Sequence, residues 1–123
     1  MSYDIRIAVK VEDTDIFAII AEPEYSSPTY NLREMFVACT GWDYTQGEFY
    51  KVEDVYDFIV HGIDELTNNE IDYIQYNPSN GWGSTTSARE ALISMKECID
   101  NIVDANSWTG WNTIPRKYLY ISW

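Results

Sequence analysis

The sequence is poor in the residues that bind metals or form disulfide bonds. It contains one histidine, His61, and two cysteines, Cys39 and Cys98, among its 123 residues. No Cys-x-x-Cys, His-x-x-x-His or Asp-x-Asp-x-Asp-Gly pattern occurs, so neither a zinc site nor a calcium site is expected. Both cysteines occupy apolar helical positions, where a reduced and buried thiol is usual. We therefore expect no metal, no cofactor and no disulfide bond.

Long apolar runs are also absent. The longest ones are too short for a transmembrane helix. The opening segment Met-Ser-Tyr-Asp-Ile-Arg-Ile lacks the basic flank and the apolar core of a secretory signal. A hydrophobic content of 46% and a charged content of 23% are ordinary for a globular protein, and 123 residues suit one domain. These features predict a single cytoplasmic domain that spans residues 1–123 and does not bind membranes.

Basic residues are scarce, and this scarcity is the most unusual property of the chain. Twenty acids against eight bases give a formal net charge of −12. Residues 43–72 hold nine acids and one base, Lys51, whereas residues 105–123 hold Arg116 and Lys117 and no acid. A charge of this sign repels nucleic acid and anionic membranes. It favours a basic partner, or it serves only to keep the protein in solution.

The spacing of apolar residues predicts two kinds of secondary structure. Strict alternation over residues 4–12, followed by the apolar run 16–21, predicts a β-hairpin, and the β-forming residues of 117–123 predict a closing strand. Helical spacing predicts three helices, which cover residues 31–40, about 52–68 and about 87–104. Residues 42–50 are expected to form a loop, and residues 71–76 a short helical extension or a strand.

The order of these elements, ββαααβ, predicts an α+β fold. A small three-stranded antiparallel sheet would pack on three helices, because each layer has one apolar face to bury. The residues expected to be most deeply buried are Phe36, Phe58, Ile59, Leu92, Met95 and Ile99.

The start of the last helix carries a possible ligand site. Ser87 and Glu90 have the spacing of a capping box, although Ser84, Thr85 and Thr86 are alternative caps. The preceding glycines could let the Asn80–Ser87 turn present N–H groups to a phosphate. The alternative is purely structural, in which the glycines shape a turn and Trp82 covers the edge of the core. No Gly-Lys-Ser/Thr motif supports the phosphate site.

Three segments of the sequence resemble a known group of proteins. The segments are Ser2-Tyr3-Asp4-Ile5, Pro28-Thr29-Tyr30-Asn31-Leu32 with Met35-Phe36, and Asn80-Gly81-Trp82-Gly83 before a helix. Together they are similar to small proteins of Gram-positive bacteria and their phages, for which no activity is known. The resemblance spans most of the chain and implies an origin in a phage or mobile element. It implies no catalytic residue and no cofactor.

Three functions remain open from the sequence. The first is a non-enzymatic protein whose acidic helix binds a basic surface of a host protein, so that its carboxylates act as mimics of nucleic-acid phosphates. The residues assigned to partner binding are Glu53, Asp54, Asp57, Asp64 and Glu65. The second is a small-ligand-binding domain, because loop aromatics can bind sugars, bases or proteins. Its assigned residues are Trp42, Tyr44, Asn80, Trp82, Ser84, Trp108 and Trp111. The third is an enzyme of unrecognised type, for which no nucleophile with an oriented base is evident.

Overall fold

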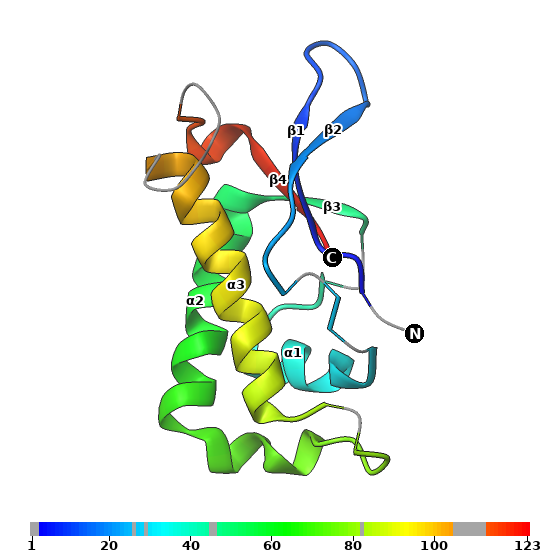
Figure 1. Cartoon of the computed structure of the whole chain (residues 1–123), viewed down its shortest axis with the longest axis vertical. Helices are drawn as coiled ribbons and strands as arrows, with labels where there is room; N and C mark the ends of the chain where they lie inside the picture. Colours follow the sequence, from blue (N-terminus) through cyan, green and yellow to red (C-terminus); the bar gives the residue numbers. More distant parts are fainter. Residues whose placement is uncertain (1–2, 26, 29, 45–46, 82, 105–112) are drawn as a thin grey trace.

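The computed structural model describes residues 3–25, 27–28, 30–44, 47–81, 83–104 and 113–123 (Figure 1). Within these residues the chain forms three α-helices, three 3-10 segments and a sheet of four strands. In chain order the elements are β1 (Arg6–Lys10), β2 (Phe17–Ala21), η1 (Tyr30–Leu32), α1 (Arg33–Thr40), β3 (Phe49–Lys51), α2 (Val52–Asn68), η3 (Glu70–Tyr76), α3 (Thr85–Asp104), η4 (Arg116–Tyr118) and β4 (Leu119–Ser122).

The sheet is antiparallel throughout, with the strand order β2-β1-β4-β3. The α+β class and the antiparallel pairing are therefore confirmed, and the predicted closing strand, β4, pairs with β1 of the hairpin. The prediction of three strands is wrong, because Phe49–Lys51 forms a short edge strand in the segment that was expected to be a loop. A strand of three residues has no readable alternation, and its conformation depends on pairing with β4.

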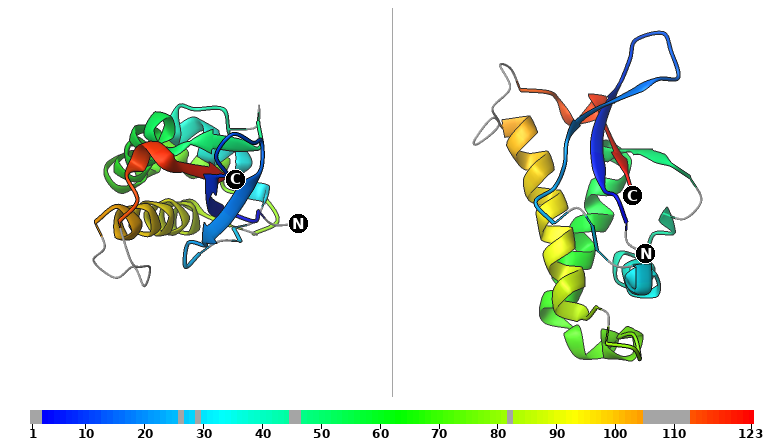
Figure 2. Two further views of the ribbon diagram at one scale, coloured as in Figure 1. Left: turned by 90° about the horizontal axis from the view of Figure 1, so that it is seen from above. Right: turned by 45° about the vertical axis from the view of Figure 1, so that its right-hand side comes forward.

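One face of the sheet contributes to the hydrophobic core. Ile5, Ile7, Leu119 and Ile121 are fully buried, as the alternation along β1 and β4 requires. Helices α2 and α3 lie side by side to one side of the sheet, and α1 packs against α2 near the end of the strands (Figures 1 and 2). The structure is thus a two-layer sandwich whose second sheet face is not covered by any of these helices.

The three helices approach one another closely at Gly62 of α2. A Cβ atom built on this residue would lie 2.9 Å from Leu92 Cδ1 on α3 and 2.9 Å from Thr40 Cγ2 on α1. Such distances are too short for real carbon contacts, so a larger residue would force the side chains of Leu92 and Thr40, or the helices that carry them, to shift. The segment Glu70–Tyr76 extends α2 as a 3-10 helix, which settles the choice between a helical extension and a strand.

The ends of the helices differ partly from expectation. Gly41 ends α1 in the left-handed conformation, with φ of 73°, as predicted for a helix-terminating glycine. The first turn of α3 is closed by Ser84 and Ser87, since Ser87 N–H donates to Ser84 Oγ at 3.3 Å and Ser84 N–H donates to Ser87 Oγ at 2.7 Å. Ser84, one of the alternative caps, therefore begins the helix, and Ser87 already lies within it. Leu32, which directly precedes α1, makes no side-chain cap hydrogen bond.

Of the six residues expected to be most deeply buried, five are confirmed: Phe36, Ile59, Leu92, Met95 and Ile99 have no exposed surface. Phe58 was placed wrongly, since 38% of its surface is exposed. It lies at the edge of the apolar stripe of α2, where its ring stacks on Trp42 with centroids 6.0 Å apart. A helix-face pattern does not distinguish such a border position from the centre of the stripe.

Replacing Leu92 with Ala should lower the free energy of unfolding by about 2–5 kcal/mol, because the removed atoms leave a cavity between α2 and α3. The matched control is Ile71→Ala on η3, where 79% of the side chain is exposed, and its effect should stay within about 0.5 kcal/mol. Urea denaturation of both variants measures the difference, and equal losses would contradict this packing.

Candidate functional site

The acidic residues assigned to partner binding lie on α2, on the side opposite its buried face. Val55, Ile59 and Leu66 anchor the helix in the core. At about 100° per residue, positions 53, 57 and 64 fall almost in line on the far side, and position 54 lies beside them. We call Glu53, Asp54, Asp57 and Asp64 the acidic face of α2. All four are exposed.

Glu65, the fifth assigned acid, differs from the other four. It is half-buried and accepts hydrogen bonds from Asn69 Nδ2 and from Tyr73 Oη, the latter at 3.1 Å. These two bonds, that from Asn69 first, lower the pKa of the Glu65 carboxyl below its usual value. Glu65 therefore stays ionised at neutral pH, and its side chain connects α2 to η3 as well as contributing charge to this side of the molecule.

The carboxylates of the acidic face are not neutralised by the chain itself. Ion pairs in the described part of the structure join Arg6 to Glu22, Lys10 to Asp15 and Lys96 to Asp100. None of them involves the acidic face. A protein with eight bases thus leaves four neighbouring carboxylates without an ion-pair partner among the described residues.

An exposed aromatic ring borders the acidic face. Phe58 follows Asp57 directly and lies one helical turn after Asp54. Its ring stacks on that of Trp42. His61 is exposed among the same acids. Sequence reasoning missed Phe58 as a surface residue because it assigned this side chain to the core. Aromatic residues are enriched in protein interfaces, whose rims are polar.

The aromatic residues proposed for ligand binding are used largely in packing. Tyr44 is only 2% exposed and its ring stacks on Trp123, with centroids 4.5 Å apart. Trp42 is half-buried, with its ring edge-on to that of Tyr50 at 4.8 Å. These two residues therefore cover the core and do not project from a loop. Trp82, Trp108 and Trp111 lie outside the described residues.

Several N–H groups at the start of α3 already have hydrogen-bond partners within the chain. Thr85 N–H donates to Asn77 Oδ1 at 3.1 Å, and Ser84 and Ser87 bond to each other. The hydroxyl of Thr85 donates to Glu70 Oε1 at 2.6 Å, which places a carboxylate at this helix end. Asn80 is exposed at the start of the turn. A phosphate would have to displace these bonds and approach a negative charge, so the turn is poorly suited to anions.

The described residues contain no group of three or more His, Cys, Asp or Glu that could hold a metal ion. Cys39 and Cys98 are both free thiols, the first buried and the second partly exposed. Burial raises the pKa of Cys39 to about 12 and that of Cys98 to about 11. Both are protonated at neutral pH, which is the opposite of an activated nucleophile.

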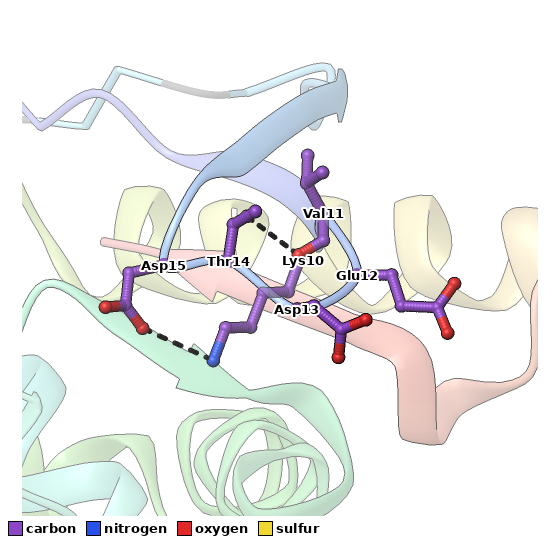
Figure 3. A pocket seen from close by; sticks show the side chains of 6 residues that line it. All are labelled: Lys10, Val11, Glu12, Asp13, Thr14 and Asp15. Atoms are coloured by element: carbon purple, nitrogen blue, oxygen red, sulfur yellow. Dashed lines mark hydrogen bonds and ion pairs between the residues drawn. The ribbon is translucent and has the colours of Figure 1, made fainter.

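Two of the surface hollows are lined entirely by described residues. The first curves around the β1–β2 turn and is lined by consecutive residues, Lys10 to Asp15 (Figure 3). There the hydroxyl of Thr14 donates to the carbonyl of Val11 at 2.8 Å, so these groups stabilise the turn. The second is lined by Arg33, Glu34, Val37, Ala38, Asp43 and Tyr76.

Comparison with known protein families, with curated proteins and with solved structures finds no match for this chain. A search of the described helices finds none with the length and apolarity needed to cross a membrane.

The thiols should react with a thiol reagent in a fixed order. In the native protein Cys98 should be labelled slowly, because its pKa is raised, and Cys39 should be labelled only after unfolding. Mass spectrometry of the labelled Cys39→Ser and Cys98→Ser variants, with and without denaturant, identifies the reacting thiol. Rapid labelling of Cys39 in the native state would contradict its burial.

Proposed function

We propose that this protein is a non-enzymatic interaction protein that uses the acidic face of α2 to bind a basic surface on another protein. The observation that carries the proposal is the exposure of Glu53, Asp54, Asp57 and Asp64 without ion-pair partners among the described residues. A net charge of −12 supplies the long-range attraction that brings such a partner in.

The mechanism is competition for a site that normally meets phosphates. Carboxylates on a helix are held at fixed spacings, about 6 Å between Glu53 and Asp57 and about 10 Å between Asp57 and Asp64 along the helix axis. Lys and Arg side chains of a nucleic-acid-binding protein would find negative charges there in place of phosphate oxygens. The resemblance to proteins of Gram-positive bacteria and their phages makes a bacterial host protein the first place to look for the partner.

Phe58 gives the proposed surface a component that does not depend on charge. An exposed aromatic ring beside the acids can enter an apolar pocket of the partner, and such rings contribute much of the binding energy in protein interfaces. The small-ligand alternative has less support, because Tyr44 is buried and the N–H groups of Ser84 and Thr85 are already bonded.

The acidic face should govern association and its response to salt. The Glu53→Gln, Asp57→Asn, Asp64→Asn triple variant should associate more slowly with a captured partner. Its affinity should also depend much less on salt concentration than that of the parent protein. Its stability should stay within about 0.5 kcal/mol per replacement of the parent protein, because the side chains are exposed. Kinetic binding measurements over a salt series, combined with denaturation, provide both readouts.

The matched control removes the same amount of charge elsewhere, at the exposed Glu34, Glu90 and Glu97. It should bind almost as the parent protein does.

A Phe58→Ala variant should lose affinity with an unchanged salt dependence, which separates the contribution of the ring from that of the charges. Displacement of nucleic acid from the captured partner tests the competition directly. Equal rates and salt slopes for the triple variant and its control would reduce the acidic face to a solubility feature.

A further inference from the structure

Strand β2 lies at an edge of the sheet and, among the residues that the structure describes, pairs on one side only, with β1. Its sequence, Phe-Ala-Ile-Ile-Ala, contains neither charge nor proline, which normally protect an edge strand from pairing with another chain. The side chains of Ile16 and Ile19 are 62% and 49% exposed beside this edge. The β1–β2 hairpin also extends beyond the helices and the other strands (Figures 1 and 2), so the edge is accessible.

The opposite edge of the sheet is protected. Strand β3 has only three residues and ends in the exposed Lys51, and short length and a lysine both disfavour pairing with another strand. Only one edge is therefore suited to pairing, and such pairing would give a closed two-fold dimer rather than a fibre.

The hydrogen-bond pattern of the hairpin shows which backbone groups point toward the open edge. Val11 N–H donates to the carbonyl of Ile16 at 2.8 Å. Hydrogen-bonded and non-hydrogen-bonded residue pairs alternate along an antiparallel ladder. Counting from the bonded pair Val11–Ile16, the pair Lys10–Phe17 is non-bonded and Val9–Ala18 is the next hydrogen-bonded pair. The backbone groups of Phe17 and Ile19, which lie in the pairs between, consequently point away from β1.

We propose that β2 pairs with β2 of a second copy of this chain, antiparallel and about a two-fold axis at Ala18. Phe17 of each copy then lies opposite Ile19 of the other. The edge-facing N–H and C=O groups of these two residues form hydrogen bonds between the copies. The small Ala18 side chains meet at the axis, where Cα atoms of a non-bonded pair approach to about 4.5 Å. The axis falls at Ala18 because the register irregularity between Ile7 and Ala8 disturbs the strand beyond Ile19.

Side chains on the uncovered sheet face favour this register. Phe17 already stacks on Phe49 at 4.1 Å and contacts Tyr120 edge-on at 5.0 Å, so its ring is held in place. Ile19 of the second copy would extend this cluster, since an aromatic residue opposite a β-branched one is a stabilising cross-strand pair. The self-complementary match of Phe17 with Ile19 identifies a second copy as the occupant.

Charge does not oppose the pairing at the edge itself. The acids that flank β2 are each paired with a base of β1, Glu22 with Arg6 at 3.2 Å and Asp15 with Lys10 at 3.7 Å. The remaining opposition is the general repulsion between two copies of charge −12, which salt screens. Salt should therefore strengthen the dimer, whereas it should weaken binding through the acidic face of α2.

Sedimentation velocity of the full chain over a range of concentrations, at low and high salt, tests the pairing. We expect a dimer whose fraction rises with protein concentration and with salt.

The Ile19→Lys variant should raise the dimer Kd by about ten-fold or more, because it places a charge on the pairing edge. This change reduces the net negative charge, so greater repulsion between copies cannot explain the loss. The matched control, Ile71→Lys at the exposed η3 position, should dimerise as the parent protein does.

Two proline variants test the register. Ile19→Pro removes an N–H that points to the open edge, so the monomer should fold while the dimer is lost. Ala18→Pro removes an N–H that bonds to β1, and should lower the melting temperature of the monomer. Thermal melts followed by circular dichroism check the fold of each variant. A protein that stays monomeric at all concentrations and salts, or a dimer that Ile19→Lys leaves intact, would overturn the proposal whether or not the acidic face binds a partner.

Discussion

The ring of Tyr44 contacts segments that are far apart in the sequence, and these contacts join α1 to the two chain ends that flank the central strands of the sheet. Its ring centroid lies 5.8 Å from that of Tyr3, 6.4 Å from Phe36 and 4.5 Å from Trp123. These partners come from the segment before β1, from α1 and from the residue after β4. The Tyr44 hydroxyl also shares a hydrogen bond with that of Tyr3, and Tyr50 Oη donates to the Tyr44 carbonyl. Burial, followed by the bond to Tyr3, raises the pKa of Tyr44 well above its usual value, so this phenol is neutral in the folded protein.

This cluster has a direct consequence for the surface. Phe36 and Tyr44 cover one end of the core, Trp42 joins the cluster from the side, and the ring of Phe58 then rests on Trp42 at the border of α2. The ring of Phe58 is consequently packed against the aromatic cluster at the border of the acidic face. A side chain that is already held by packing loses less conformational entropy on binding, which favours Phe58 as part of the proposed surface.

The two proposed surfaces differ in physical character. The acidic face of α2 carries charge without internal neutralisation, so its interactions weaken when salt screens them. The β2 edge is uncharged, and the acids at its ends are paired with Arg6 and Lys10. Because the two surfaces lie on different elements, an acidic face would remain available on each copy of a dimer formed through β2. Two linked copies would then bind a partner with two basic sites more tightly than one copy does.

The sequence alone determined the α+β class, the hairpin, the three helices and most of the core, because alternation and helical spacing follow directly from backbone geometry. It also determined the exposure of Asp57 and its neighbours, which face away from a clear apolar stripe. Only the tertiary structure decided the features that depend on contacts between distant residues. Strand β3 exists because β4 lies beside it, and Ser84 begins α3 through a bond to Ser87 that competes with other possible caps. Tyr44 is buried because aromatic residues distant in the sequence cover it. Phe58 is exposed because it lies at the border of the apolar stripe of α2. Local spacing encodes neither outcome.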